Sequence, residues 1–370
     1  MARPRTLRRK VRRVCVLTSG GDAPGLNAVV RGLVKHGERL GLELFGSEDG
    51  FTGLVEGQLL PLSSTTVRGK LPTGGSVLGC SGRANPFAFP RPDKRGRMRT
   101  TDESATARAT LANNAIDVLV VIGGDGSQAF AMAFYDTGVP VIGVPKAVDN
   151  DLAATDVTFG FDAAISTATW AIDTLHATAE AHHRVMVLEV MGRDAGFIAL
   201  HAGIAGGADV VLIPEIPYDV ERVAAKIRRR KARGSTLSIV VVAEGARPKG
   251  KAASKARRGR RRPGGAGLRL EAQLAPLIPE HEVRTTALGH LQRGGAPTAG
   301  DRVLGTRLGV RAAELAAKGR VGRLVALRGT SVVDVPLEDA LGEGRRVDRA
   351  GELAMTARAV GIELGARAPR

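Results

Sequence analysis

The sequence has very few cysteines and few aromatic side chains. Cys15 and Cys80 are its two cysteines, and Cys15 falls inside a predicted buried strand, so the pattern indicates neither a disulfide framework nor a cysteine metal site. Aromatic residues make up 3% of the chain, which leaves few rings on which nucleic-acid bases could stack. No apolar run approaches the roughly 18 residues of a membrane span. We expect a globular protein of a reducing cytoplasm.

The sequence also lacks a phosphate loop of the GxxxxGK[ST] type, and its charge is unevenly placed. The formal net charge is +17. Residues 1–13 hold seven Arg or Lys and no acid, and residues 226–262 hold fifteen against Glu244 alone, so the remainder is mildly acidic. Residues 249–267 have almost no large apolar side chains, which predicts a disordered, solvated surface loop. Contact of this loop with nucleic acid is the less favoured alternative.

The basic N-terminal segment runs directly into VCVLTSGG, without the apolar core and small-residue cleavage site of a secretory signal. The length of 370 residues exceeds what one hydrophobic core usually serves, and 43% of the residues are hydrophobic. Two globular lobes are therefore expected.

The stretch from Asp117 to Leu152 carries the strongest local pattern. Val118–Ile122 and Val139–Val144 are short, continuous apolar runs, which predict strands buried on both faces. Between them Ser127 is predicted to cap a helix that runs to about Tyr135. A strand, a helix and a strand within about 35 residues form a βαβ unit of a parallel sheet, whose ligands bind beyond the carboxyl ends of the strands.

The loops after these two strands hold what phosphoryl transfer needs. Glycines in Gly124–Ser127 let an anion approach backbone N–H groups at a helix N-terminus, and Asp125 adds an oxygen ligand for Mg²⁺. In the second loop one of Asp149 and Asp151 can act as a base while the other supports it. Lys146 brings a positive charge for the migrating phosphoryl group. The alternative to a phosphoryl-transfer site is a tight turn followed by a solvated acidic loop without a catalytic role.

Further glycine-rich loops precede or follow this unit. A strand over Val11–Leu17 leads into a glycine loop and a helix over Thr18–Gly41, which again brings amides to an anion. Phe51 could stack on a purine or belong to the core. Arg83 lies in a third glycine loop and can bind phosphate bidentately. Arg193 follows a predicted strand, on the ligand side of a second sheet.

Five motifs in order, GGDAPGLNAVVRG, GGDGS, PKAVDND, EVMGRDAGFIAL and LGHLQRGG, resemble the 6-phosphofructokinases over roughly Val11–Leu341, in the bacterial branch with ATP-using and pyrophosphate-using members. The resemblance implies two Rossmann-like three-layer α/β/α lobes with mostly parallel sheets. The larger, nucleotide-binding lobe would comprise residues 1–160 and 292–342, and the smaller, sugar-phosphate lobe residues 161–291 and 343–370.

The resemblance also implies a role for each matching residue. Asp149 would take the proton from the sugar 1-hydroxyl, with Asp151 and Lys146 nearby, and Arg193 would stabilise the transferring phosphoryl group. The donor ATP and its Mg²⁺, held by Asp125, would be bound by Gly21, Phe51, Arg83, Gly124, Asp125, Gly126 and Ser127. The sugar would be lined by Ala147, Val148, Asp149, Met191, Gly192, Arg193, Glu244, His290, Leu291, Gln292 and Arg293. Arg184 and Arg284 would hold its 6-phosphate from a neighbouring subunit of a homo-oligomer, usually a tetramer.

Three positions bear on the donor and on the rate. Pyrophosphate users carry Asp where this chain has Gly126, which favours ATP, whereas Lys146 resembles the pyrophosphate users and some ATP users. The family usually has Thr at Ala147, so a hydroxyl that faces the phosphoryl group is missing. The predicted activity is ATP-dependent phosphorylation of fructose 6-phosphate. A pyrophosphate-dependent enzyme, another sugar-phosphate kinase and a catalytically weak regulatory paralogue remain alternatives.

Overall fold

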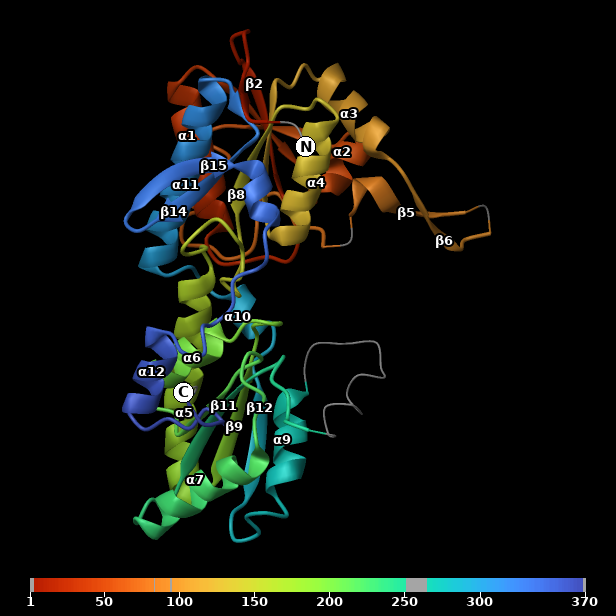
Figure 1. The fold of residues 1–370 in the computed structure, drawn as a ribbon. Coiled ribbons are helices and arrows are strands. Elements are labelled where there is room, and N and C mark those ends of the chain that lie inside the picture. Colours follow the sequence, from red (N-terminus) through yellow and green to blue (C-terminus); the bar gives the residue numbers. More distant parts are fainter. Residues whose placement is uncertain (1–2, 83, 94, 251–264, 369–370) are drawn as a thin grey trace. The chain divides into compact units, whose positions relative to one another are not determined.

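In the computed structural model, residues 3–82, 84–93, 95–250 and 265–368 are described. The chain divides into two compact units. Unit 1 comprises Met1–Val148, Leu152–Asp162 and Arg293–Gly344, and unit 2 comprises Asp149–Asp151, Ala163–Gln292 and Arg345–Arg370. Each unit has its own sheet with helices on both faces (Figure 1). The predicted α/β/α fold with mostly parallel sheets is confirmed, and each unit is described separately below.

The sheet of unit 1 has seven strands in the order β15-β14-β8-β7-β2-β3-β4. They are β2 (Arg13–Thr18), β3 (Glu43–Ser47), β4 (Leu59–Leu62), β7 (Val118–Gly123), β8 (Val141–Pro145), β14 (Arg323–Arg328) and β15 (Ser331–Pro336). The five inner strands are parallel, and the edge strands β4 and β15 pair antiparallel to their neighbours. Every residue of β7 and β8 is buried, as expected for strands covered on both faces.

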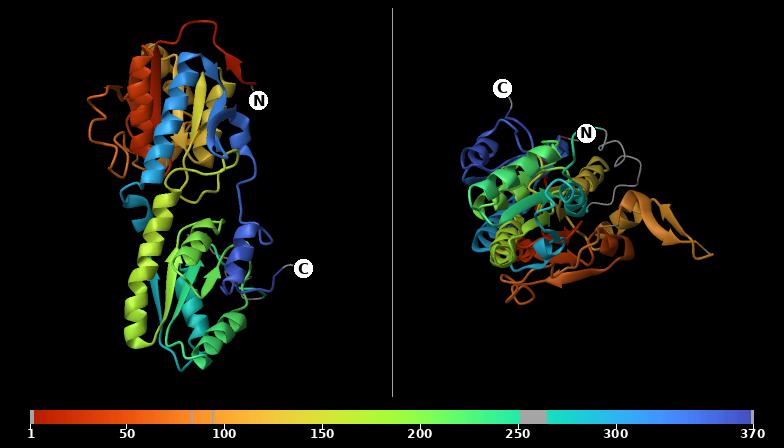
Figure 2. Two further views of the ribbon diagram at one scale, coloured as in Figure 1. Left: turned by 90° about the vertical axis from the view of Figure 1, so that its left-hand side faces the viewer. Right: turned by 90° about the horizontal axis from the view of Figure 1, so that it is seen from below.

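Helices cover both faces of this sheet. They are α1 (Leu26–Arg39), α2 (Phe51–Glu56), α3 (Ser104–Asn113), α4 (Asp125–Asp136) and α11 (Ala299–Ala317), with the short helices η1 (Pro86–Ala88) and η2 (Leu337–Leu341). α1 and α11 lie side by side on one face, and α4 lies on the other (Figures 1 and 2). Gly309 permits this close approach of the two helices, because a Cβ there would lie 2.2 Å from the Val29 carbonyl oxygen.

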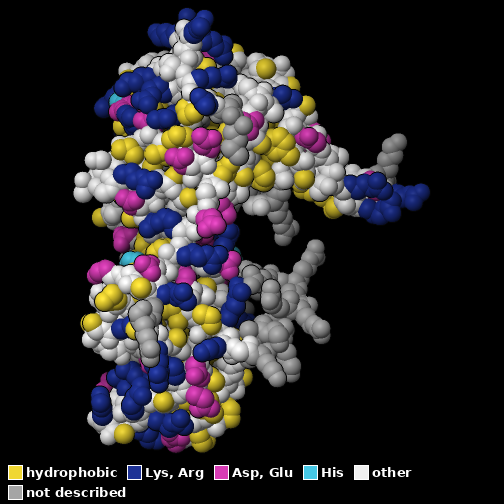
Figure 3. Space-filling view, viewed as in Figure 1, with side chains coloured by type: hydrophobic (Ala, Val, Ile, Leu, Met, Phe, Trp, Pro, Cys, Tyr) yellow, Lys and Arg dark blue, Asp and Glu magenta, His cyan; other side chains and the backbone are white. Residues whose placement is uncertain are grey.

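Two small antiparallel pairs complete unit 1. β1 (Arg5–Thr6) pairs with β13 (Arg320–Val321), and β5 (Phe89–Pro92) pairs with β6 (Met98–Thr101). The β5–β6 hairpin extends away from the body of the unit (Figure 1). Its side chains from residue 95 to residue 101 are exposed, and basic side chains gather at its tip (Figure 3).

Unit 2 contains a parallel four-stranded sheet in the order β10-β11-β9-β12. Its strands are β9 (Val185–Val190), β10 (Val210–Leu212), β11 (Ser238–Ala243) and β12 (Val283–Ala287). The helices are α5 (Phe161–His182, which begins in unit 1), α6 (Phe197–Ala205), α7 (Val220–Ala232), α9 (Ala266–Leu274), α10 (Leu291–Gly294, which ends in unit 1) and α12 (Glu352–Ala359). α7 and α9 pack on one face through a buried aliphatic core that includes Val223, Leu270 and Val240. Among the described residues, no helix combines the length and the apolar character needed to cross a membrane.

The predicted elements are present, with ends shifted by a few residues, but two expectations about individual residues are wrong. Ser127 does not cap α4, which begins at Asp125 after Gly124. Ala266 and Gly267, expected in a disordered loop, form the buried start of α9, while residues 251–264 of that prediction lie outside the described part of the chain.

Candidate functional site

The three loops of unit 1 that carry most of the residues predicted for phosphoryl transfer leave the sheet at one edge. β2, β7 and β8 are adjacent and parallel, with Thr18 opposite Ile122 and Gly123 opposite Pro145. The chain continues from β2 towards β3 on one side and from β7 towards β8 on the other, so β2 and β7 flank a topological switch point. Ligands of open α/β sheets bind at such points, beyond the carboxyl ends of the strands.

Local hydrogen bonds hold these three loops against one another. The backbone N–H of Lys146 donates to the Gly123 carbonyl oxygen at 3.0 Å, and the side chain of buried Ser127 donates to the Ser19 hydroxyl at 3.0 Å. Gln128, which is fully buried, donates to the carbonyl oxygens of Gly123 and Val144, each at 3.0 Å. The strand ends from which the loops depart are therefore tied together across β7 and β8.

The GGDGS loop presents an open helix N-terminus. Asp125 and Gly126 are exposed in the first turn of α4. A Cβ placed on Gly126 would meet no atom within 4 Å, so the space beside this position is open. Exposed backbone N–H groups at a helix N-terminus favour an anion. The arrangement suits a phosphate chain.

Lys146 lies beneath the first glycine loop. Its side chain is 4% exposed, and its ammonium group donates to the Gly21 carbonyl oxygen at 2.5 Å. Arg293 reaches the same loop and donates from Nη1 to the Asp22 carbonyl oxygen at 2.9 Å. The sequence resemblance placed Arg293 with the sugar and gave no sign of this contact, because residues 22 and 293 lie 271 positions apart in the chain.

The prediction that Phe51 binds the nucleotide is wrong. It is fully buried, and its ring stacks on Phe134 with the centroids 5.8 Å apart and meets Phe130 edge to face at 5.8 Å. A ring without exposed surface cannot stack on a purine, so the core alternative is correct for Phe51. Arg83 lies outside the described residues.

The acidic loop after β8 lies at the boundary of the two units, with Ala147 and Val148 in unit 1 and Asp149–Asp151 in unit 2. Asp149 is 3% exposed, and its Oδ2 lies 3.7 Å from Nε of Arg193. Asn150 has a positive φ of 54°, which asparagine tolerates, whereas the φ of 49° at Arg193 is costly for a residue other than glycine. Arg193 therefore holds a strained backbone conformation while its side chain lies beside the Asp149 carboxylate.

The predicted sugar-lining residues of unit 2 gather at the carboxyl edge of its sheet. Met191, Gly192 and Arg193 follow β9, Glu244 follows β11, and His290, Leu291 and Gln292 follow β12. The backbone N–H of Arg193 donates to Oε1 of Glu244 at 2.9 Å. Gly245 must lack a side chain, because a Cβ there would lie 1.8 Å from the Arg193 carbonyl oxygen. Of this group His290 and Leu291 are exposed, and Gln292 is fully buried.

Arg184 and Arg284 do not join that edge. Arg184 precedes β9 and pairs with Glu282 at 2.5 Å, and Arg284, the second residue of β12, pairs with the same carboxylate. Arg184 and Met191 flank β9, which has six residues at about 3.3 Å each, so the two residues are separated by roughly 20 Å along the strand. These two arginines therefore form a separate cluster at the amino end of the sheet of unit 2.

Unit 2 also contains a basic cavity that the sequence did not predict. It has a volume of about 280 Å³ and is lined by Lys226, Arg229, Arg230, Arg233, Arg358, Gly361, Ile362 and Glu363. Arg230 pairs there with Asp209 at 2.8 Å. Burial raises the pKa of Asp209 above its usual value, although a backbone hydrogen bond from Ile239 and the charge of Arg230 oppose the shift. Figure 3 shows Lys and Arg gathered over the end of the unit that contains α7.

Among the described residues, no group of three or more His, Cys, Asp or Glu side chains could hold a metal ion. Mg²⁺ in phosphoryl-transfer sites is commonly bound by one or two carboxylates together with substrate phosphates and waters. The exposed carboxylate of Asp125, at the start of α4, fits that smaller requirement.

Comparison with known proteins shows the family of the chain. A family model described as phosphofructokinase matches residues 13–316. The chain is 50% identical over 357 residues to an ATP-dependent 6-phosphofructokinase of Chloroflexus aurantiacus, which covers 96% of this chain and 98% of that protein. It is 47% identical over 345 residues to a pyrophosphate–fructose 6-phosphate 1-phosphotransferase of Streptomyces coelicolor, covering 91% of this chain and 97% of that protein.

Among solved structures, phosphofructokinase from Saccharomyces cerevisiae matches with a TM-score of 0.75 and 29% identity over 95% of this chain. This chain spans 47% of that yeast chain. A pyrophosphate-dependent phosphofructokinase from Marinobacter aquaeolei also has a TM-score of 0.75 at 21% identity, which supports the fold. Because the family model covers well over half of the chain and curated relatives match along nearly their whole length, the chain belongs to the phosphofructokinase family.

Proposed function

We propose that this phosphofructokinase transfers the terminal phosphoryl group of ATP to the 1-hydroxyl of fructose 6-phosphate, as in glycolysis. The observation that carries the proposal is that the loops after β2, β7 and β8 leave the sheet of unit 1 at one edge, beside its switch point, in a chain 50% identical to an ATP-dependent relative. Unit 1 is assigned to the nucleotide and unit 2 to the sugar phosphate. A coupled assay on purified protein, with ATP and pyrophosphate compared at equal concentration, tests this directly.

The donor phosphates are assigned to backbone amides of unit 1. Gly21, in the loop before α1, and residues Gly124–Ser127, at the start of α4, supply these N–H groups. Asp125 would hold Mg²⁺, which when bound neutralises charge on the transferring group. Arg83 is assigned to the nucleotide from the sequence resemblance alone.

The acceptor is assigned to polar groups of unit 2. Asp149 takes the proton of the sugar 1-hydroxyl while that oxygen attacks the terminal phosphorus of the donor, and ADP leaves with its bridging oxygen. The guanidinium of Arg193, 3.7 Å from Asp149, supplies positive charge where negative charge is transferred. Glu244 orients Arg193 through the backbone N–H of that residue and is assigned to a sugar hydroxyl.

The cluster of Arg184 and Arg284 supports assembly into a homo-oligomer. Because both arginines lie at the amino end of the sheet of unit 2, they are too far along the strands to reach the sugar bound at its carboxyl end. We assign them to the 6-phosphate bound by a neighbouring subunit of a tetramer. Sedimentation of the purified protein, with and without fructose 6-phosphate, measures the subunit number.

Gly126→Asp tests the choice of donor. The substitution is sterically permitted, since a Cβ at this position meets no atom within 4 Å. The new carboxylate would repel the α-phosphate of ATP. This repulsion makes the binding free energy of ATP less favourable, so we expect kcat/KM for ATP to fall about tenfold or more. Activity with pyrophosphate, which has no α-phosphate at that position, should rise or stay constant. A variant that uses ATP as well as the parent protein would show that Gly126 does not select the donor.

Ala147→Thr tests whether the missing hydroxyl limits the rate. Ala147 is partly exposed, and its carbonyl oxygen accepts a hydrogen bond from Thr158, which holds the backbone independently of the side chain. One well-placed donor to the reacting phosphoryl group can contribute about 10²–10³ in rate, so we expect kcat to rise by roughly tenfold or more. The steady-state rate at saturating ATP and fructose 6-phosphate measures this. An Ala147→Val variant adds similar volume without the hydroxyl and should not show the increase.

Pyrophosphate is the alternative donor for this chain. The pyrophosphate-dependent relative from Streptomyces coelicolor is 47% identical to it, and the ATP-dependent relative is 50% identical. Turnover with pyrophosphate and none with ATP would establish that alternative. Binding of a nucleotide without turnover on either donor would instead identify a regulatory paralogue.

A further inference from the structure

The first glycine loop of unit 1, Gly20–Gly25, is held from one side by two cations. Lys146 donates from its ammonium group to the Gly21 carbonyl oxygen at 2.5 Å, and Arg293 donates from Nη1 to the Asp22 carbonyl oxygen at 2.9 Å. Both side chains are buried, with exposed fractions of 4% for Lys146 and 9% for Arg293. Two successive carbonyl groups of one loop are therefore fixed by positive charges that come from distant parts of the sequence.

The cations pack directly against the main chain of the loop. A Cβ on Gly20 would lie 3.1 Å from Nζ of Lys146, and a Cβ on Gly21 would lie 3.0 Å from Nη1 of Arg293. Gly20 also has a positive φ of 82°, which residues other than glycine rarely adopt. The two glycines are thus needed for the cations to approach the carbonyl groups.

The far end of the loop is enclosed as well. A Cβ on Gly25 would lie 3.1 Å from the Phe159 ring and 3.4 Å from the Asp301 carbonyl oxygen. The carboxylate of Asp301, which is 2% exposed, accepts from the Gly160 N–H at 2.7 Å. The loop therefore has little freedom to move towards the residues beneath it.

The direction of the carbonyl groups decides where the amides point. In a trans peptide the C=O and the following N–H point in opposite directions, so fixing the Gly21 and Asp22 carbonyls turns the N–H groups of Asp22 and Ala23 away from the two cations. Within the described part of the chain, the N–H groups of Gly21, Asp22 and Ala23 donate no hydrogen bond. They are available to an anion at the edge of the sheet where Gly124 and Asp125 also lie.

We propose that Arg293 is a positioning residue for the donor phosphates, acting with Lys146 to hold the loop Gly20–Gly25 in its anion-binding conformation. This inference rests on the proposed function, in which that loop binds ATP. It gives Arg293 a role that is independent of the sugar, whereas the sequence resemblance assigned it to the sugar alone. Loss of Arg293 should then weaken the binding of the donor even when no sugar phosphate is present.

The test measures ATP binding to the full-length protein by calorimetry, with Mg²⁺ and without sugar phosphate. Arg293→Gln removes the charged donor to the Asp22 carbonyl and should weaken ATP binding about tenfold, since a hydrogen bond from a charged group contributes that much or more. Arg293→Lys retains one donor and should recover most of the affinity. Arg293 is the better probe, because Lys146 is also assigned to the phosphoryl group itself.

Arg302→Gln is the matched control. Arg302 also donates to a backbone carbonyl of unit 1, that of Pro297 at 2.9 Å, but away from the glycine loop, so its loss should leave ATP binding unchanged. Hydrogen exchange of peptides covering residues 19–29 should speed up in Arg293→Gln and not in Arg302→Gln.

The proposal is overturned if Arg293→Gln binds ATP as tightly as the parent protein and only KM for fructose 6-phosphate rises. It is also overturned if exchange across residues 19–29 is unchanged. Failure of the proposed function would appear separately, as absence of turnover by the parent protein, and the exchange comparison does not depend on turnover. If the parent protein proves to use pyrophosphate, pyrophosphate replaces ATP as the probe with the same expected tenfold loss.

Discussion

Asp149→Asn should lower kcat by about 10³, because a positioned general base typically contributes 10²–10⁴ to the rate. Asparagine has nearly the same volume as aspartate, so it fills a position that is 3% exposed without creating a cavity. It cannot take the proton of the sugar hydroxyl. The dissociation constant of ATP, measured by calorimetry in the absence of the sugar, should stay within about twofold, since the proposed donor contacts lie in unit 1.

Asp151→Asn is the matched comparison for this experiment. Asp151 lies two residues further on in the same loop, and its backbone carbonyl accepts from Arg345, which fixes the chain independently of the carboxylate. We expect kcat of this variant to fall about tenfold or less, consistent with a supporting role. If kcat fell equally in both variants, the loss could not be assigned to a base at Asp149. If Asp149→Asn kept the kcat of the parent protein, Asp149 would not be the base.

The buried strands could be predicted from the sequence because their apolar runs are continuous and end at glycine or proline. β7 and β8 are the clearest cases, since all of their residues are buried and the loops that follow them carry the polar residues. Once the strands are placed in a parallel sheet, the grouping of Gly124, Lys146 and their neighbours at one edge follows from topology alone. The candidate site was predictable for this reason, before any side chain was positioned.

The roles of Phe51 and Arg293 could not be predicted in this way. An aromatic residue after a glycine turn is equally compatible with a ligand and with the core, and only its packing on Phe130 and Phe134 decides between them. The contact of Arg293 with the Asp22 carbonyl joins residues 271 positions apart in the sequence. Hydrogen bonds between distant segments leave no periodic signal.

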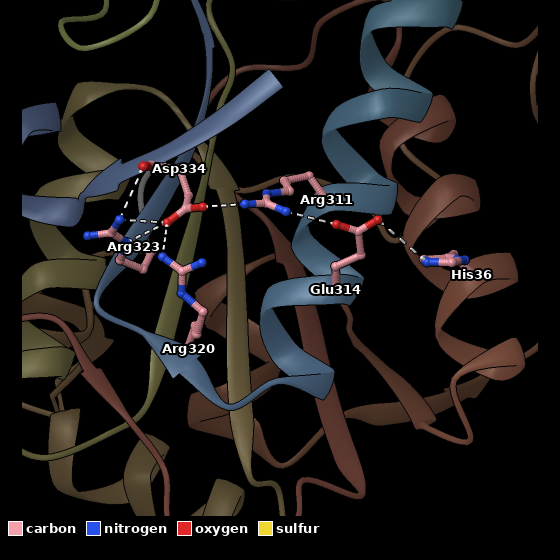
Figure 4. Close-up of polar contacts among 6 residues, drawn as sticks. All are labelled: His36, Arg311, Glu314, Arg320, Arg323 and Asp334. Atoms are coloured by element: carbon pink, nitrogen blue, oxygen red, sulfur yellow. Dashed lines mark hydrogen bonds and ion pairs between the residues drawn. The ribbon is translucent and has the colours of Figure 1, made fainter. Parts of the chain in front are cut away.

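The network around Asp334 likewise could not be predicted from the sequence, because it joins side chains of different elements. The carboxylate of Asp334, in β15, accepts from Arg311 at 2.5 Å, from Arg320 at 2.9 Å and from Nε of Arg323 at 2.7 Å (Figure 4). These arginines come from α11, β13 and β14, so one acidic side chain joins four elements of unit 1. Arg311 continues the network to Glu314, whose other oxygen lies 3.9 Å from Nε2 of His36 in α1.

Asp334→Asn should therefore destabilise unit 1. The carboxylate is 5% exposed, and removing one partner of a buried ion pair typically costs 3–5 kcal/mol because the remaining charge stays uncompensated. The side chains of Arg311, Arg320 and Arg323 are 20–41% exposed and can recover some hydration, so we expect the lower end, about 3 kcal/mol. Hydrogen exchange of β14 and β15 peptides measures this loss within unit 1. Glu338→Gln, an exposed carboxylate four residues away, should change the stability by less than about 0.5 kcal/mol.

The effect of Asp334→Asn should also depend on pH. Burial by itself would raise the pKa of Asp334, but hydrogen bonds from Arg311 and Arg323 and the charges of Arg323 and Arg320 outweigh it and hold the pKa below its usual value. A carboxyl group whose pKa is lower in the folded state adds stability that is fully present above its unfolded pKa, about 4, and is lost as the pH falls through the folded value. The difference in unfolding free energy between the parent protein and Asp334→Asn should therefore be constant above about pH 5 and shrink below about pH 4. A difference that stayed the same down to pH 3 would show that lost packing, and not the charge of Asp334, accounts for the destabilisation.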